Sequence, residues 1–301
     1  MAYPPTDAPR RILLLGKRGQ VGWELWRALA PLGEVTALGS SQLDLSDSVG
    51  IRTTLRGARP HLIVNAAAYT AVDRGEKEAE LARIINSVAP AILAEEARRL
   101  GAAIVHYSTD YVFDGEDMAP YTEEDEPNPL NVYGETKLAG ERAIQGAGAA
   151  HLILRTQWIY GTRGKNFLLT ILRLARERRQ LRVVDDQFGS PTWCRLIAET
   201  TAQILVRGKG DFAGLLEQSG GLYHLTADGQ TSWYDFAKAI VELDPGRDEH
   251  ILEELTPVPS TEYPTPARRP AHSALANEKL NRRFGLKLPD WRTQLGLALD
   301  A

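Results

Sequence analysis

The chain has 301 residues, of which 43% are hydrophobic and 25% charged, a composition typical of folded globular proteins rather than disordered ones. Its net charge of −4, with lysine and arginine dispersed along the sequence, gives no general attraction to nucleic acid or to an anionic membrane surface. A single cysteine, Cys194, excludes an internal disulfide, and the six histidines never fall at metal-ligand spacing, so we expect no metal site.

The N-terminal segment MAYPPTDAPR is rich in proline and lacks the apolar stretch of a secretion signal. No later segment has the roughly 18 uninterrupted apolar residues that a membrane span requires. We therefore expect a cytoplasmic protein without a membrane partner.

The first half of the chain alternates short apolar runs with amphipathic stretches, the pattern of a parallel sheet covered by helices on both faces. RILLL at 11–15 predicts a first strand, and the stretch from Gln20 to Leu29 predicts a helix that stops before Pro31. Further strands are predicted at EVTAL, HLIVN, AAIVHY and HLILR, with helices near 47–56, 76–99 and 131–145. These units predict an α/β fold with a Rossmann-type, doubly wound parallel sheet.

After about Arg155 the pattern loosens. We expect helices at 164–178, 193–206 and 232–243, short strands at RVV and YHLT, an acidic glycine-rich stretch at 208–221, and an extended loop broken by prolines at 257–270. Residues 1–155 are therefore assigned to the Rossmann domain. Residues 156–301 are assigned mainly to a smaller substrate-binding lobe, parts of which can return to the first domain.

A glycine-rich turn, Gly16-Lys17-Arg18-Gly19-Gln20-Val21-Gly22, joins the first predicted strand to the first predicted helix. Such a turn lets backbone N–H groups and the helix N-terminus meet a pyrophosphate. Two residues separate its first pair of glycines, which is the spacing of the short-chain dehydrogenases. The turn indicates a dinucleotide-binding domain; the alternative is a tight turn without a ligand.

The end of the second strand bears on which nicotinamide cofactor fits. An NAD-specific site has an acidic residue there for the ribose 2′-hydroxyl, but this chain has Gly39-Ser40-Ser41. Without that carboxylate, and with Lys17 and Arg18 available to a 2′-phosphate, we expect NADPH and leave NADH open as a second cofactor. The alternative is that both cations face solvent. Asp44 and Leu45 are candidate cofactor contacts near the adenine, although Asp44 can equally begin a turn.

Tyr133 and Lys137 are four residues apart on a predicted helix and therefore share one face of it. A free phenol has a pKa of about 10, and lowering that pKa to about 7 requires roughly 4 kcal/mol. One ammonium at about 4 Å supplies an energy of this size at an effective dielectric constant of about 20. The pair therefore predicts a tyrosine acid that is activated by its lysine.

The same spacing occurs a second time, at Tyr234 and Lys238. The second pair lies in a late amphipathic helix beside Trp233, far along the chain from the glycine turn, so packing explains it. The first pair follows the strand AAIVHY and its polar exit, where a doubly wound sheet binds its ligand. Thr109 at that exit can hydrogen-bond the substrate oxygen that Tyr133 protonates.

Small residues, Ala66, Ala67 and Ala68, follow the third predicted strand and let a cofactor approach the backbone, although small residues also simply pack well. Asn86 could fix water or backbone near the site, and capping of a helix before Pro90 is the alternative.

With these motifs the chain resembles the dTDP-4-dehydrorhamnose reductases, a family of extended short-chain dehydrogenases. The resemblance runs through nearly the whole chain, in GKRGQVG, LDLSD, NAAAYTAVD, HYSTDYVFDG, NVYGETKLAGE, LRTQWIYG, GKNF, DQFGSPT and ARRPAHSAL. It implies NADPH-dependent reduction of the C4 keto group of a dTDP-linked 4-keto-6-deoxysugar, with Thr109, Tyr133 and Lys137 as the catalytic set. A homodimer is also compatible with this resemblance.

The resemblance further implies a substrate site. Thr70 and Val72 would flank the sugar, Tyr111 and Trp158 would wall it, and Asn166 would reach the nucleotide. Arg268 and Arg269 could pair with the diphosphate, or be ordinary loop charges.

The same motifs bear on three alternative functions: dehydratase, epimerase and non-catalytic subunit. Nucleotide-sugar dehydratases carry Asp-Glu after their threonine, whereas this chain has Asp110-Tyr111, which favours reduction over elimination. Epimerases share the tyrosine and lysine, but STDYVF favours the reductases. A non-catalytic NADP-binding subunit resembling the β-subunit of methionine adenosyltransferase would have no need of a proton donor.

Overall fold

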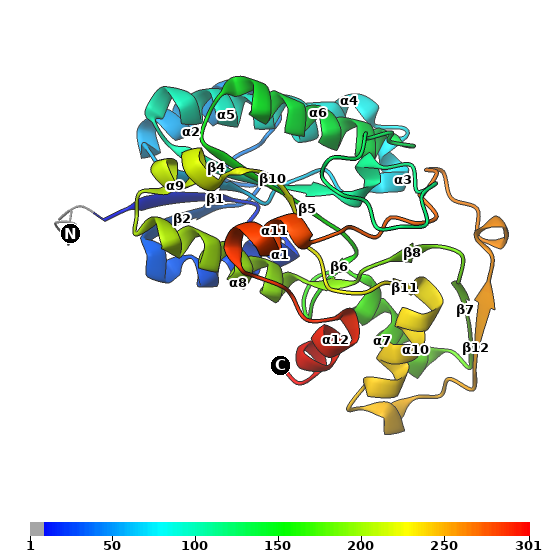
Figure 1. The fold of residues 1–301 in the computed structure, drawn as a ribbon. Coiled ribbons are helices and arrows are strands. Elements are labelled where there is room, and N and C mark those ends of the chain that lie inside the picture. The colour runs from blue at the N-terminus through cyan, green and yellow to red at the C-terminus, as the bar shows by residue number, and fades with distance from the viewer. Residues whose placement is uncertain (1–8) are drawn as a thin grey trace.

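The computed structural model describes residues 9–301; residues 1–8, most of the proline-rich segment considered above, lie outside the described residues. At its centre is a parallel six-stranded sheet with the strand order β10-β5-β4-β3-β1-β2 (Figure 1). The strands are β1 (Arg11–Leu15), β2 (Glu34–Leu38), β3 (Leu62–Asn65), β4 (Ala103–Thr109), β5 (His151–Thr156) and β10 (Gly221–His224). The order reverses between β1 and β3, so the predicted Rossmann-type, doubly wound sheet is confirmed.

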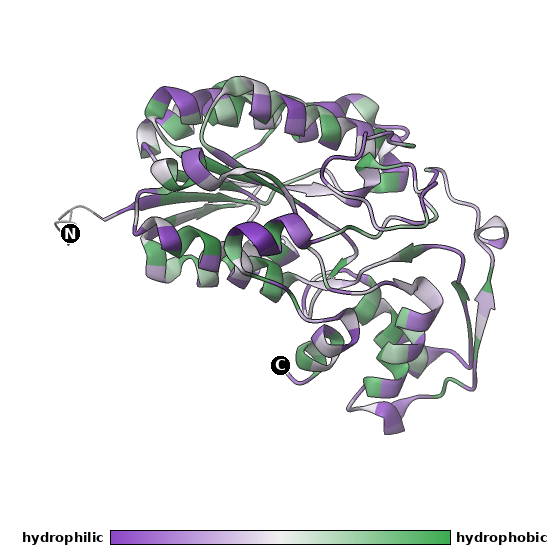
Figure 2. Ribbon diagram, viewed as in Figure 1, coloured by the Kyte–Doolittle hydropathy of each residue, from purple (hydrophilic) through white to green (hydrophobic). Residues whose placement is uncertain are grey.

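Helices cover both faces of this sheet, which explains why its strands are continuous apolar runs. Along β1, Ile12 and Leu14 pack into one hydrophobic cluster, and Leu13 and Leu15 into the other. Figure 2 shows the hydrophobic strands between helices whose outer surfaces are hydrophilic. One face carries α2 (Ser48–Ala58), α5 (Ala89–Leu100) and α6 (Val132–Ala147); the other carries α1 (Gln20–Ala28), α8 (Cys194–Leu205), α9 (Phe212–Ser219) and α11 (Glu278–Phe284).

A smaller lobe lies beyond the carboxyl ends of the central strands, at the lower right of Figure 1. It contains α7 (Phe167–Glu177), α10 (Trp233–Leu243) and α12 (Trp291–Leu299). Three short strand pairs complete it: β6 (Ile159–Tyr160) with β9 (Thr192–Trp193), β7 (Gln180–Val184) with β12 (Glu254–Val258), and β8 (Phe188–Gly189) with β11 (Thr231–Ser232). The late segments β10, α8, α9 and α11 nevertheless belong to the central sheet and its covering helices. Among residues 9–301, no helix is long and apolar enough to cross a membrane.

The helix predicted at 76–99 starts at Ala79 in the structure and contains a π-helical turn. After α3 (Val72–Gly75) the chain forms α4 (Ala79–Arg83), a π-helical turn (Ile84–Val88) and then α5. The Asn86 side chain explains the irregular turn, because it accepts the Tyr69 N–H at 2.8 Å and donates to the Tyr69 carbonyl at 3.1 Å. Asn86 therefore fixes the loop after β3 and does not cap a helix before Pro90.

Two other segments also differ from the prediction. The glycine-rich stretch 208–221 contains the helix α9, which Asp211 caps and which buries Phe212 and Leu216 against the sheet. The proline-broken segment contains the strand β12, which pairs with β7 alone, so Pro257 costs no essential sheet hydrogen bond. In both segments burial and pairing outweigh the local turn signals.

Candidate active site

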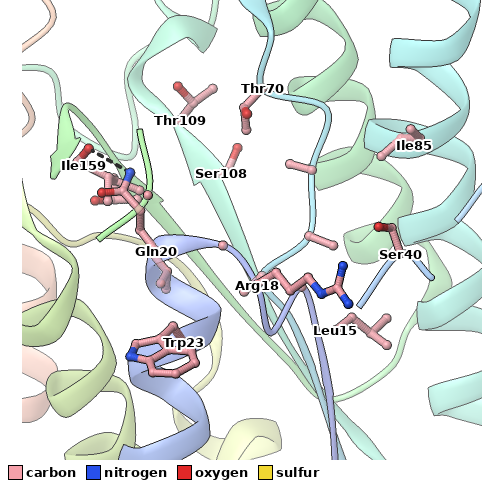
Figure 3. Close-up of a pocket in the computed structure, with 18 of the residues that line it drawn as sticks. Leu15, Arg18, Gln20, Trp23, Ser40, Thr70, Ile85, Ser108, Thr109 and Ile159 are labelled. Atoms are coloured by element: carbon pink, nitrogen blue, oxygen red, sulfur yellow. Dashed lines mark hydrogen bonds between the residues drawn. The ribbon is translucent and has the colours of Figure 1, made fainter. Parts of the chain in front are cut away.

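A cavity of about 920 Å³ lies where the carboxyl ends of the central strands face the smaller lobe (Figure 3). It is large enough for a dinucleotide and part of a second ligand. The residues predicted for the site that line this cavity are Gly16, Arg18, Gly19, Gln20, Val21, Asp44, Leu45, Ala66, Ala67, Ala68, Thr70, Val72, Thr109, Tyr111, Tyr133 and Trp158. Lys17, Gly22, Lys137, Asn166 and Arg269 are not part of the lining.

The glycine turn leaves no room for side chains where the backbone must pass closely. Gly16 has a φ of +86°, and a Cβ there would lie 2.7 Å from the Ala66 carbonyl carbon. A Cβ on Gly22 would lie 2.1 Å from the Gly16 oxygen, so α1 can start beside the turn only without one. With Ala66 and Ala67 opposite, the turn offers a phosphate the bare backbone and the N-terminus of α1. The residues present therefore fit a dinucleotide.

The two cations of the turn point in different directions. The Arg18 side chain lies along Gly39, where a Cβ would be 3.6 Å from its Cγ, Cδ and Nε, and it reaches toward Ser40 at the cavity edge (Figure 3). Lys17 instead places its Nζ 5.7 Å from the centre of the Trp26 ring. Arg18 is therefore the cation of the turn that faces the cavity edge, and a role for either cation at a 2′-phosphate stays a prediction.

Asp44 begins a turn at the cavity wall, so both its predicted turn and its predicted cofactor contact fit its position. It lines the cavity, and its Oδ1 also accepts hydrogen bonds from the backbone N–H and the hydroxyl of Ser46, both at 2.8 Å. These hydrogen bonds lower the pKa of Asp44, so the turn holds an ionised carboxylate at the cavity wall.

The exit of β4 brings Thr109 and Tyr133 to one end of the cavity. Tyr133 lies in the first turn of α6, where Asn131 accepts the Gly134 N–H at 2.9 Å. A Cβ on Gly134 would lie 2.0 Å from the Tyr111 carbonyl oxygen, so glycine lets the helix start directly against the β4 exit. Burial raises the pKa of Tyr133 to about 12, and a hydrogen bond with Thr109 only partly opposes it.

Lys137 is fully buried below the cavity floor. Its Nζ donates to the Tyr107 carbonyl oxygen at 2.5 Å and lies 3.1 Å from His106 Nε2. Burial lowers the pKa of Lys137 to about 8 and holds the pKa of His106 well below its usual range. The pKa of Tyr133 is raised because loss of hydration outweighs its interaction with Thr109, and activation of Tyr133 by Lys137 stays a prediction.

The second tyrosine and lysine pair lies elsewhere. Tyr234 donates its hydroxyl to the Leu255 carbonyl at 3.4 Å within the smaller lobe, and Lys238 borders a separate depression. Neither residue lines the large cavity, so the packing explanation agrees with their positions.

Of the residues expected to contact the substrate, four line the cavity and two do not. Thr70, Val72, Tyr111 and Trp158 line the cavity. Asn166 instead caps α7, accepting the Leu169 N–H at 3.0 Å, and donates to Gln20 Oε1 at 2.8 Å. Arg269 forms an ion pair with Asp73 at 2.8 Å. In this state Asn166 and Arg269 hold the cavity walls together rather than face the cavity.

Some lining residues were not identified from the sequence. Trp233 stacks on Trp158, with ring centres 3.5 Å apart and planes 8° from parallel. Arg163 and Lys165 also line the cavity, as does Asp110. The sequence places Trp233 in an amphipathic helix without showing that the helix begins at the cavity. Asp110 stands in the motif that carried the resemblance and was used only to separate reductases from dehydratases.

Known proteins are similar to this chain over nearly its whole length. Residues 10–301 match the family model described as the RmlD substrate binding domain. The dTDP-4-dehydrorhamnose reductase of Escherichia coli K12 is 50% identical, over 93% of this chain and 94% of its own length. The reductase of the same name from Burkholderia thailandensis is 47% identical, over 96% of this chain and 98% of its own length.

Solved structures give the same result. A dTDP-4-dehydrorhamnose reductase from Clostridium acetobutylicum superposes with a TM-score of 0.88 at 36% identity, covering 96% of this chain and 98% of that one. The enzyme from Bacillus anthracis in complex with NADP has a TM-score of 0.87 at 32% identity, covering 97% of this chain and 99% of that one.

Proposed function

The chain belongs to the dTDP-4-dehydrorhamnose reductase family, and we propose that it reduces the C4 keto group of dTDP-4-dehydro-L-rhamnose with NADPH to give dTDP-L-rhamnose. The observation that carries the proposal is a single cavity with the glycine turn of β1 at one end and the hydroxyls of Thr109 and Tyr133 at the β4 exit. A dinucleotide site and a proton donor in one cavity are what a carbonyl reduction requires.

The residues proposed to hold the cofactor are those of the glycine turn together with Arg18, Asp44, Leu45 and the alanines after β3. NADPH supplies the hydride that reduces a carbonyl carbon. The phenol of Tyr133 donates its proton to the carbonyl oxygen, so that the C4 keto group becomes a hydroxyl. Thr109 orients that oxygen, and Lys137 compensates the phenolate left on Tyr133 once its amine is released from His106.

The proposed sugar site lies between Thr70, Val72, Tyr111 and Trp158. The aromatic faces suit the apolar face of a 6-deoxyhexose, and their burial excludes water from the reacting carbonyl. In the loaded enzyme we propose that Asn166 and Arg269 reach the nucleotide and its diphosphate; both would have to leave their present partners, Gln20 and Asp73. The proposal also includes a cytoplasmic location, which cell fractionation tests, and the homodimer that the resemblance implies, which size-exclusion chromatography tests.

The direct experiment follows NADPH absorbance after adding enzymatically generated dTDP-4-dehydro-L-rhamnose, and then identifies the product by NMR. We expect one NADPH to be oxidised per sugar and dTDP-L-rhamnose to form. The epimer at C4 would show that the chain is a related dTDP-4-ketohexose reductase. No oxidation of NADPH with any 4-ketosugar, together with co-purification of a synthetase, would favour a regulatory subunit instead.

A further inference from the structure

Asp110 is a buried carboxyl group at the reacting end of the cavity, and none of the roles above uses it. Its side chain is only 2% exposed, and the residue belongs to the cavity lining. Its Oδ1 accepts the Thr109 hydroxyl at 3.0 Å, while its Oδ2 is buried without a hydrogen-bond partner among residues 9–301. A buried acceptor without a partner is costly, so a chemical role is the natural explanation.

The single hydrogen of the Thr109 hydroxyl links Asp110 to the reaction. A threonine hydroxyl has one hydrogen, and here Asp110 receives it. The Tyr111 N–H donates to the same oxygen at 3.2 Å, and the Tyr133 phenol lies close enough for Thr109 to lower its pKa. Thr109 therefore lies between Tyr133 and Asp110 at this end of the cavity, hydrogen-bonded to Asp110. While Asp110 is ionised, Thr109 cannot donate to a sugar carbonyl.

The proton affinities of Asp110 and Tyr133 have the order that a relay requires. Burial raises the pKa of Asp110 to about 6 and the pKa of Tyr133 to about 12, so a proton on the carboxyl moves downhill to a phenolate. Tyr111 and Tyr133 are the titratable groups facing Asp110, Ser273 approaches it from the C-terminal loop, and Arg269 lies beside Tyr111. No cation contacts the carboxyl directly among its described neighbours.

We propose that Asp110 is a positioning residue that returns a proton to Tyr133 through Thr109 after each reduction; the inference rests on the proposed function. The Tyr133 O–H bond breaks as the O4–H bond of the sugar forms. The Thr109 hydrogen then moves to the phenolate, and the Asp110 hydrogen moves to Thr109. Asp110 is left as a carboxylate, and it takes a proton from water once the product has left.

The test in the working enzyme is the pH profile of kcat for Asp110→Asn. The amide keeps the shape and a hydrogen bond to Thr109 but cannot transfer a proton, so kcat should fall about 10²-fold with KM changed less than about threefold. Wild-type kcat should fall with a one-proton slope above the carboxyl pKa, and the variant should lose this limb. The matched control is Asp117→Asn, an exposed carboxylate of the following loop, which should keep the wild-type profile. An unchanged profile in Asp110→Asn would overturn the relay.

A second measurement does not need turnover. In the ligand-free protein, the infrared carboxylic-acid band of Asp110, identified by subtracting the Asp110→Asn spectrum, should be present at pH 5 and lost by pH 8. Thr109→Val should shift its frequency, whereas Thr109→Ser should leave it unchanged. A missing band, or one insensitive to Thr109→Val, would refute the relay even if the enzyme reduces the ketosugar. Conversely, a coupled band in a chain that oxidises no NADPH would refute the proposed function and retain the proton chain.

Discussion

Replacing Arg18 by alanine should weaken the use of NADPH more than that of NADH while leaving the chemistry intact. Arg18 is an exposed side chain that lies along Gly39 and reaches the cavity edge beside Ser40. A hydrogen bond to a charged group contributes about 1.5–3 kcal/mol, but an exposed ion pair contributes less than about 1 kcal/mol. We take about 1.4 kcal/mol between these ranges, which is a tenfold change in affinity.

The assay is kcat/KM for NADPH and for NADH at fixed ketosugar concentration. Arg18→Ala should lower kcat/KM for NADPH roughly tenfold and change the value for NADH less than about twofold. Lys17→Ala is the matched comparison, because the two cations are neighbours in the turn but Lys17 lies over Trp26. It should change both values less than about threefold. Equal losses for both cofactors in Arg18→Ala, or a larger effect from Lys17→Ala, would refute the assignment.

A second variant tests the same geometry with the opposite charge. Gly39→Asp places a carboxylate where NAD-specific sites have one, and ordinary van der Waals contact with Arg18 at 3.6 Å leaves room for its Cβ. It should repel the 2′-phosphate, pair with Arg18 and favour NADH. A Gly39→Asp enzyme that keeps the NADPH preference would show that the 2′-phosphate binds elsewhere.

Three further outcomes follow from the site. Tyr133→Phe should lower kcat at least 10²-fold with NADPH affinity unchanged by fluorescence titration, whereas Tyr234→Phe should keep wild-type turnover. Gly22→Ala, whose Cβ would meet the Gly16 oxygen at 2.1 Å, should weaken NADPH binding more than about tenfold and lower the melting temperature. The pKa of Asp110 is raised from 3.8 to about 6, so its favourable contribution is complete below pH 3.8 and is lost as pH rises through 6. Asp110→Asn should therefore be more stable than wild type at pH 8, by up to about 3 kcal/mol in urea unfolding, and similar at pH 4; equal stability at both would contradict the buried charge.

Much of the fold could be predicted because its central strands are covered on both faces. RILLL reads as a strand since Ile12 and Leu13 enter different hydrophobic clusters, and each requires an apolar side chain. The helix α9 could not be predicted in the same way, because glycines surround it and only contact with the sheet shows that Phe212 and Leu216 are core residues. Long-range burial of this kind leaves little trace in a local sequence window.

In the site, too, residues in local motifs could be predicted, whereas residues placed by tertiary packing could not. Spacing identified the glycine turn, and spacing together with the position after β4 identified Tyr133. It could not distinguish Lys17 from Arg18, because the direction of each side chain depends on the positive φ of Gly16 and on what packs beside the turn. Nor could it identify Trp233, because the start of α10 reaches the cavity only through the packing of the lobe.

The protonation state of Lys137 follows from the hydrogen bonds of its neighbours, which no sequence motif reveals. The Ala67 N–H donates to Asn65 Oδ1 at 3.2 Å, so the amide NH₂ of Asn65 faces His106 Nδ1 at 3.1 Å. Nδ1 must then accept, and the single proton of neutral His106 sits on Nε2, facing the Lys137 nitrogen. Lys137 can accept that N–H only as a neutral amine, the form that burial favours by lowering its pKa to about 8. The tyrosine and lysine spacing therefore identifies the partners, but the charge on the lysine is set by Asn65 and His106. An ammonium able to stabilise the Tyr133 phenolate can form only after the amine leaves this histidine.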